Sequence, residues 1–355
     1  MISVIIVNYH SARLTQRAVD SVFQEDGNEV FVVDNTADPE EKKLLRDMFE
    51  GRPVTLLFNE TNTGFGRACN QAYTLSRGDY IFLLNPDAYV VPPCLRVMKK
   101  FLEDRPDAGA VSPLLFWDSG MTYFFPRALL PSPGRDLAVR LSFLSRVFGS
   151  LYSMAERKEN LKIWESSSPV MVRNISGGSA FLRRKAIEDC GGLFDERFFL
   201  FYEDSDLFLR MQKKGYRLYV VPSARAVHRH LHSHEKLDMM SRTQPLYYEK
   251  HFTGSFMQRI VSVIPEARRT PECVDVGDWS TPPLFTVPRR LRKGYLFEWS
   301  PTPLFVPSVG YIGAGEELLF PVEIWDSIDK GDYYCRFTDR GRMLAPHDII
   351  RWSKN

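Results

Sequence analysis

Carboxylates follow two apolar runs of this sequence, and each could serve a different chemistry. Asp87 comes after the run YIFLL, residues 80–84, where a hard oxygen ligand suits Mg²⁺ or Mn²⁺ bound together with a substrate phosphate. Asp34 comes directly after EVFVV, where its carboxylate could accept hydrogen bonds from a nucleobase or a ribose hydroxyl. Either aspartate could equally be a turn residue or a helix cap, so neither alone defines a site.

Three more acids, Glu203, Asp204 and Asp206, follow the aromatic run FFLFY at the start of a predicted helix. Favourable charge at a helix N-terminus accounts for acids at these positions, most readily for Glu203 and Asp206. A carboxylate beside apolar groups can also have its proton affinity tuned for general-base catalysis. Both interpretations stay open at this point.

The segment NTGFGRACN, residues 62–70, places two glycines before a helix. Such a turn can bring backbone N–H groups and a helix N-terminus close to a phosphate, and Arg67 adds a cation. A glycine turn before a helix is common, so the segment is weak evidence alone. It matches neither GxGxxG nor the P-loop pattern, which disfavours a dehydrogenase or an ATPase.

Four histidines alternate in HRHLHSH, at residues 228, 230, 232 and 234. On a strand they would share one face. A four-histidine zinc site lacks the usual ligand mixture. His228, at the end of the run ARAVH, is better placed as a single metal ligand.

The elements that must position these residues alternate between strand and helix over the first hundred residues. Near-continuous apolar strands separated by helices indicate a parallel sheet covered on both faces, an α/β Rossmann-like fold. Such sheets bind ligands at the carboxyl ends of their strands. The polar residues at these ends are Asn8, Tyr9, Asp34, Asn35, Asn59, Asn85 and Asp87.

Composition narrows the class of protein. The chain has 355 residues, 44% hydrophobic and 25% charged, with a net charge of +2 that indicates no nucleic-acid partner. Five scattered cysteines without a CxxC pair disfavour a disulfide framework and fit a reducing cytoplasm. We expect MISVIIVNYH to form a strand and not a signal peptide. No window approaches the ~20 apolar residues of a membrane span, so we expect any membrane contact to be peripheral.

Residues 135–157 combine apolar positions at helical spacing with four arginines. An amphipathic helix packed on the core would give this pattern, and so would a helix that lies on an anionic membrane surface. From residue 255 the chain becomes proline-rich, with short apolar runs that predict a β-rich module. Its aromatic residues include Trp279, Trp299, Tyr311 and Trp325, which would form either a small core or a glycan-binding surface.

The sequence resembles inverting family-2 glycosyltransferases of the GT-A fold, in particular the bacterial rhamnosyltransferase-like branch. The resemblance rests on five segments in order: SVIIVNYHS, VVDN, NTGFGRACN, LLNPDAYV and the long segment that begins SGGSAFLRRKAIEDC. It covers residues 1–252, which we expect to be the catalytic domain, and leaves the module at 255–355 without an assigned role.

The resemblance implies roles for individual residues. Asp34 would contact the nucleobase, and the rest of the nucleotide site would comprise Val7, Asn8, Tyr9, Asn62, Gly64, Arg67 and Asn85. NPD stands where the family has its DxD motif, so Asp87 and His228 would bind Mg²⁺ or Mn²⁺. Asn85 replaces the first aspartate and could contact the ribose or a metal-bound water.

The remaining implied roles concern the transfer itself. Asp204, the second acid of YED, matches the general base. Gly177 and Gly178 would leave room for the donor sugar and the acceptor, and Glu203 would help to orient the acceptor. The resemblance therefore implies a metal-dependent, inverting hexosyl transfer in cell-surface polysaccharide synthesis.

The expected donor is dTDP-rhamnose or a UDP-sugar, and the expected acceptor is a hydroxyl of a glycan or a polyprenyl-linked sugar. We expect a cytoplasmic protein, at the inner face of the plasma membrane if residues 135–157 bind lipid, and we leave a homodimer open. The alternative is a non-catalytic carbohydrate-binding or assembly protein built on a nucleotide-sugar-binding fold. A nucleotidyltransferase would need a basic pyrophosphorylase loop near the N-terminus, which we do not find.

Overall fold

The computed structural model describes residues 1–229, 234–265, 272–339 and 349–355. The first four strands are β1 (Ile2–Asn8), β2 (Asn28–Asp34), β3 (Val54–Phe58) and β4 (Tyr80–Leu84). They pair in parallel in the order β3-β2-β1-β4. The helices between them are α1 (Ala12–Val22), α2 (Pro39–Phe49) and α3 (Phe65–Leu75).

Both faces of this sheet are covered, as predicted. Val4 and Ile6 of β1 belong to one hydrophobic core, which includes residues of α1 and α2. Ile5 and Val7 belong to a second core on the opposite face, which includes residues of α3. Because successive strand side chains point to opposite faces, the run ISVIIV, which is apolar except for Ser3, fills both cores.

The sheet continues through further strands and the helices between them, and the sequence did not predict each of these strands separately. These elements are β5 (Ala88–Val91), α4 (Cys94–Asp104), β6 (Ala108–Phe116), β7 (Tyr123–Phe124), β8 (Val170–Val172), β9 (Ser179–Arg183), α7 (Arg184–Asp189), α8 (Glu203–Lys213) and β10 (Arg217–His228). β9 lies antiparallel between β4 and β6, and β10 runs parallel to β6. β10 also pairs antiparallel with β5, so the chain has a mixed α/β sheet.

Residues 135–157 do not form the single helix that we expected. The structure has α5 (Pro133–Leu144) and α6 (Arg146–Trp164), joined by an extended Ser145 with φ −137° and ψ 130°. The break exposes apolar side chains at the corner, because the two helices turn away from the core there. The exposed residues are Leu144, Val147, Phe148 and Leu151.

Two further helices follow β10. α9 (His234–Phe252) packs on α8, where Asp206 is fully buried and forms ion pairs with Arg210, Lys250 and His251. α10 (Phe256–Val263) lies beside α5. Of the helices in the described part of the chain, none combines the length and apolar character needed to cross a bilayer. His230, His232 and the side chain of His234 lie outside the described residues.

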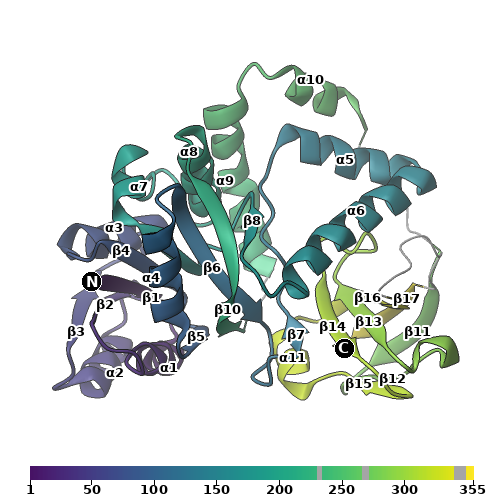
Figure 1. Ribbon diagram of the computed structural model, residues 1–355, viewed down its shortest axis with the longest axis horizontal. Helices are drawn as coiled ribbons and strands as arrows, with labels where there is room; N and C mark the ends of the chain where they lie inside the picture. Colours follow the sequence, from purple (N-terminus) through teal and green to yellow (C-terminus); the bar gives the residue numbers. More distant parts are fainter. Residues whose placement is uncertain (230–233, 266–271, 340–348) are drawn as a thin grey trace.

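The C-terminal region is β-rich, as the proline-rich sequence predicts. Its elements are β11 (Val274–Trp279), β12 (Leu284–Thr286), β13 (Tyr295–Ser300), β14 (Val309–Gly313), β15 (Glu317–Leu319), α11 (Val322–Ser327), β16 (Gly331–Thr338) and β17 (Ile350–Lys354), with a short 3₁₀ turn at Arg289–Leu291. β14 pairs with β7, so this sheet is continuous with the N-terminal one (Figure 1).

The aromatic side chains of the C-terminal region form its core. Trp299 and Trp325 are buried, and Trp279 and Tyr311 pack against the same cluster. The four rings therefore do not form the glycan-binding surface that we considered, because their faces are used for packing within the sheet. This removes the observation that motivated a non-catalytic carbohydrate-binding role.

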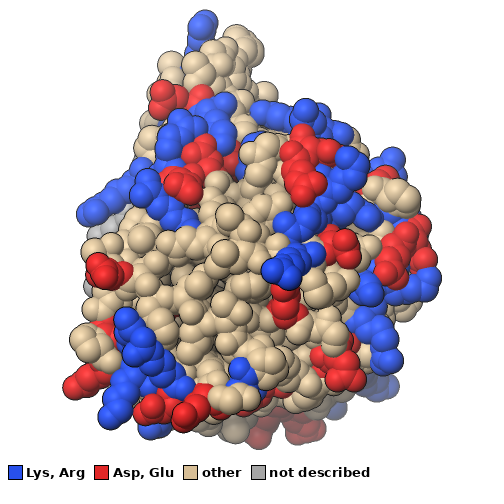
Figure 2. All heavy atoms as spheres, turned by 90° about the vertical axis from the view of Figure 1, so that its left-hand side faces the viewer, with Lys and Arg blue, Asp and Glu red and all other residues tan. Residues whose placement is uncertain are grey.

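Charged residues of both signs are mixed on the face shown in Figure 2. Among the described residues on this face, acidic and basic side chains surround a broad region of uncharged ones (Figure 2). A surface of this kind differs from the basic stripe with which nucleic-acid-binding proteins track a phosphate backbone.

Candidate active site

The NPD turn and the end of β10 meet at one corner of the sheet, which we call the Asp87–His228 corner. His228 pairs opposite Ala88, its Nε2 lies 3.3 Å from Oδ1 of Asp87, and Nδ2 of Asn85 lies 3.5 Å from the same nitrogen. The side chains of His228 and Asp87 are 3% and 14% exposed. The structure therefore brings together the two residues that were predicted to bind metal, with Asn85 beside them.

The two glycines of SGG connect this corner to Asp204. The backbone N–H of Asn85 donates to the carbonyl of Gly178 at 2.8 Å, and the backbone N–H of Gly177 donates to Oδ2 of Asp204 at 3.1 Å. A Cβ on Gly178 would lie 2.5 Å from Nδ2 of Asn85. Only glycine allows the loop before β9 to pass this close to the side chains of Asn85 and Asp204.

Asp204 is oriented by three hydrogen bonds at the start of α8. Besides Gly177, the N–H of Ser205 donates to Oδ1 of Asp204 at 2.6 Å and its hydroxyl donates to the same atom at 3.2 Å. Burial raises the pKa of Asp204, and these hydrogen bonds oppose that rise. The carboxylate is therefore fixed in direction and more basic than a surface aspartate, which suits a general base.

A strained turn precedes this carboxylate. Phe201 and Tyr202 have φ values of 69° and 67°, which lie in a backbone region that residues other than glycine rarely adopt. The turn places Glu203 in the interior, where it is 5% exposed and Oε2 has no hydrogen-bond partner among the described residues. Burial, with a smaller contribution from the charge of Asp204, raises the pKa of Glu203 to about 8. A direct contact of Glu203 with the acceptor stays a prediction.

The carboxyl ends of β1 and β2 form a second polar group. Asn8 is fully buried, and its Nδ2 donates to Oδ1 of Asp34 and to Oε1 of Glu41, each at 3.0 Å. The N–H of Thr36 also donates to Oδ1 of Asp34, at 3.1 Å. Asn8 thus holds Asp34 in place, and a contact between Asn8 and a nucleotide stays a prediction.

The glycine turn before α3 lies next to this group. Oδ1 of Asn62 accepts from Nδ2 of Asn35 at 2.8 Å and from the N–H of Gly64 at 3.0 Å. Gly64 has φ 86°, and a Cβ there would lie 2.4 Å from the carbonyl oxygen of Phe199. The turn is therefore packed on the loop before α8, which links the predicted nucleotide site to Asp204.

Three other predicted nucleotide-binding residues take no part in these two hydrogen-bonded groups. Val7 is buried in the second core, whereas Tyr9 is 53% exposed beyond the end of β1. Arg67 is 55% exposed and lies 3.7 Å from the carboxylate of Glu196. Contacts of these three residues with a nucleotide stay predictions.

Comparison with known proteins bears on this arrangement. The model of the family described as "Glycosyl transferase family 2" matches residues 3–191. The chain belongs to this family. The match and the mixed α/β sheet confirm the predicted glycosyltransferase of the GT-A fold class.

Curated relatives come from the same branch as the predicted resemblance. The N-acetylglucosaminyl-diphospho-decaprenol L-rhamnosyltransferase of Mycobacterium tuberculosis (strain H37Rv) is 32% identical over 195 residues, which are 51% of this chain and 60% of that protein. The rhamnosyltransferase WbbL of Escherichia coli (strain K12) is 23% identical over 74% of this chain and 95% of its own length. The chain thus spans 60% of the length of the mycobacterial relative.

One solved structure aligns with part of this chain. The mannosyltransferase PcManGT from Pyrobaculum calidifontis, in complex with GDP-Man and Mn²⁺, aligns with a TM-score of 0.48 and 21% identity. The alignment covers 74% of this chain and 68% of that one.

Sequence reasoning missed several residues of this family-2 site. The ring of Phe125 stacks on that of His228, and Arg229 donates its backbone N–H to the carbonyl of Asp87 at 3.0 Å. Glu323 of α11 forms an ion pair with Arg229. These residues are far apart in the sequence and no motif joins them, so only the packing of β7, β10 and α11 around the corner could reveal them.

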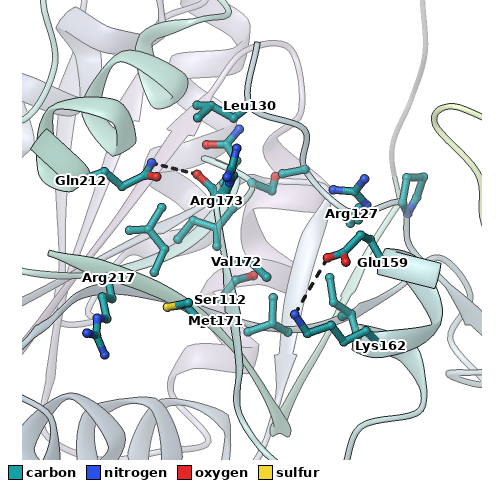
Figure 3. A pocket seen from close by; sticks show the side chains of 18 of the residues that line it. Ser112, Arg127, Leu130, Glu159, Lys162, Met171, Val172, Arg173, Gln212 and Arg217 are labelled. Atoms are coloured by element: carbon teal, nitrogen blue, oxygen red, sulfur yellow. Dashed lines mark hydrogen bonds and ion pairs between the residues drawn. The ribbon is translucent and has the colours of Figure 1, made fainter. Parts of the chain in front are cut away.

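A cavity of about 1020 Å³ lies between α6 and α8. Figure 3 shows Glu159 and Lys162 on its α6 side and Gln212 on its α8 side. Ser176 also lines the cavity and directly precedes Gly177. The cavity therefore reaches the segment that orients Asp204, and its volume matches the ~300–1,000 Å³ of ligand pockets.

Proposed function

We propose that the chain is a metal-dependent, inverting glycosyltransferase in which Asp204 is the general base. The observation that carries this proposal is the arrangement around Gly177 and Gly178. One glycine contacts Asp204, and the other contacts Asn85 at the Asp87–His228 corner. A base and a candidate phosphate-binding group that contact two adjacent glycines are the parts that a sugar transfer needs.

The chemistry of the corner fits a divalent ion. A carboxylate oxygen and an imidazole nitrogen converge at 3.3 Å, and these are ligands that Mn²⁺ accepts. Within the described parts of the chain, no group of three His, Cys, Asp or Glu gathers as a metal site. Asp87 and His228 would therefore provide the protein ligands, with diphosphate oxygens and water in the other positions.

The chain's own residues would perform the remaining steps. Asp204, oriented by Gly177 and Ser205, would accept the proton of the acceptor hydroxyl. That oxygen would form a bond to the anomeric carbon while the bond from this carbon to the nucleoside diphosphate breaks on the opposite side, which inverts the configuration. When bound, the divalent ion neutralises the charge of the departing diphosphate.

The donor and acceptor follow from the family and the relatives. We favour rhamnose carried by dTDP, or a UDP-sugar, because two relatives are named as rhamnosyltransferases. Asp34 would contact the base. The cavity beside Ser176 is suited to the acceptor, a glycan or a polyprenyl-linked sugar of a cell-surface polysaccharide. Residues 1–252 would form the transferase domain, and residues 255–355 the small β-rich C-terminal module whose sheet continues that of the domain.

We also propose that one end of the molecule contacts an anionic membrane surface at the cytoplasmic face. α10 exposes Phe256 and Val263, which are 75% and 79% exposed, and the α5–α6 corner exposes Val147 and Phe148. Both lie at the upper right of Figure 1. Arg146, which forms an exposed ion pair with Glu272, lies in the same corner, and exposed apolar residues beside a basic one suit a lipid interface. A homodimer stays a prediction.

A thermal-shift screen of nucleoside diphosphates with and without Mn²⁺ tests the site. We expect UDP or dTDP to raise the melting temperature, since a ligand at a hundredfold excess over its Kd stabilises by ~2.7 kcal/mol. Asp87→Asn should remove the added effect of Mn²⁺ and keep the metal-independent part. The proposal fails if no nucleotide shifts the wild type and no donor is turned over.

A further inference from the structure

A row of aromatic rings joins His228 to the C-terminal sheet. The ring of His228 stacks on Phe125 with centroids 4.9 Å apart and planes 14° apart. Phe125 lies 5.4 Å from Trp117, and Trp117 lies 5.4 Å from Trp299 of β13. Trp117 and Trp299 are each 2% exposed and His228 is buried, whereas Phe125, between His228 and Trp117, is partly buried, so most of the row is shielded from water.

The central ring of this row is also hydrogen-bonded from the C-terminal side. Nε1 of Trp117 donates to Oγ of Ser327 at 2.8 Å, and that hydroxyl donates to the carbonyl of Ile324 at 2.8 Å. Ser327 ends α11. This hydrogen bond fixes the plane of the Trp117 ring. Because Phe125 packs against that ring, the orientation of Phe125 is restricted as well.

A second connection reaches the same corner from α11. Arg229 donates its backbone N–H to the carbonyl of Asp87 at 3.0 Å, and its guanidinium forms an ion pair with Glu323. Oε2 of Glu323 accepts from the N–H and hydroxyl of Ser119 at 3.0 and 2.8 Å. The Glu323 side chain is 24% exposed, so this carboxylate is partly shielded from water while it bridges α11, the β6–β7 loop and the end of β10.

We infer that α11 and β13 are positioning elements for the Asp87–His228 corner, which gives the C-terminal module a role in catalysis. The inference rests on the proposed metal site. The chain would supply only two side-chain ligands to the ion, Asp87 and His228. The orientation of the His228 ring and the position of the Asp87 backbone therefore determine whether both ligands can bind the same ion. Groups that orient metal ligands typically change metal affinity 10–100-fold when they are altered.

Glu323→Gln and Asp332→Asn form a matched pair for testing this role. Each removes one carboxylate from the C-terminal module, but Asp332 forms a half-exposed ion pair with Arg351 between β16 and β17. The free Mn²⁺ signal in electron paramagnetic resonance, with UDP or dTDP at a fixed concentration, gives the apparent Mn²⁺ Kd. We expect Glu323→Gln to raise this Kd about tenfold or more and Asp332→Asn to leave it within twofold. Activity of Glu323→Gln should return at high Mn²⁺.

A measurement without metal separates this inference from the proposed function. The imidazole NMR resonances of His228 should shift or broaden in Glu323→Gln and in Ser327→Ala, and stay unchanged in Asp332→Asn. Equal spectra and equal Mn²⁺ Kd values for Glu323→Gln and Asp332→Asn would overturn the positioning role. If the wild type does not bind Mn²⁺ but the His228 resonances still change in Glu323→Gln and Ser327→Ala alone, the proposed metal site is contradicted. The positioning of His228 by the C-terminal module is then supported.

Discussion

The backbone N–H of Gly177 donates to Oδ2 of Asp204 at 3.1 Å, and this contact joins the loop before β9 to the start of α8. The two residues approach so closely that a Cβ on Gly177 would lie 2.8 Å from Cβ of Asp204. A carboxylate held in this way loses little orientation during a reaction, which is what an efficient base requires.

Asp204→Asn should abolish sugar transfer while nucleotide binding persists. The amide has nearly the same shape and can accept the hydrogen bond from Gly177, but it cannot take a proton at neutral pH. We expect kcat to fall by about 10²–10⁴-fold, with an unchanged nucleotide Kd in isothermal titration calorimetry. A variant that retained a tenth of the wild-type kcat would show that another group is the base.

Gly177→Ala should misplace the base without unfolding the protein. The added methyl group must displace Asp204, and a misplacement of 1 Å can cost about 10²-fold in rate. We expect kcat to fall at least tenfold with an unchanged KM for the donor. Gly294→Ala is the matched control, because its Cβ would meet no atom within 4 Å. Equal kcat values for the two variants would contradict the contact.

Glu203→Gln should change how stability depends on pH. The pKa of Glu203 is raised to about 8 in the folded state, whereas a glutamate in an unfolded chain titrates near ~4.3. The folded state alone therefore holds this proton between the two values, and its stability falls as pH rises toward 8, by up to about 1.4 kcal/mol per pH unit. Glutamine cannot titrate, so the variant lacks this slope.

Urea unfolding at pH 5, 6.5 and 8 measures the effect of this substitution. Relative to the wild type, Glu203→Gln should gain stability between pH 5 and pH 8. Glu60→Gln, at an exposed position, provides the reference for a surface substitution. Parallel stability curves for the wild type and Glu203→Gln would show that Glu203 is not protonated in the folded protein at neutral pH.

The double variant Phe148→Ser, Phe256→Ser should lose binding to lipid vesicles. The side chains are 53% and 75% exposed, so their removal costs little folding energy but removes apolar area that a lipid interface would bury. Co-sedimentation with phosphatidylcholine vesicles containing phosphatidylglycerol measures this binding. Leu75→Ser, at a 52% exposed position on α3, is the matched control and should bind like the wild type. Equal sedimentation of both variants would remove the membrane proposal.

The sequence by itself determined the sheet and the polar residues at its edge. Near-continuous apolar runs such as ISVIIV and YIFLL favour a sheet that is buried on both faces, and parallel strands bring Asn8, Asp34 and Asp87 to one edge. The order of the glycine and acid motifs also sufficed for the family. Local pattern carries this information because strand and helix periodicity depend on neighbouring residues.

Only the tertiary structure decided which of these residues touch. The distance from Asp87 to His228 depends on the antiparallel pairing of β10 with β5, and these strands are more than a hundred residues apart. The break at Ser145, the burial of Glu203 and the reach of Glu323 to Arg229 depend likewise on packing between distant elements. Such contacts leave no periodic trace in the sequence, because they are set by how whole layers dock and not by the preferences of adjacent residues.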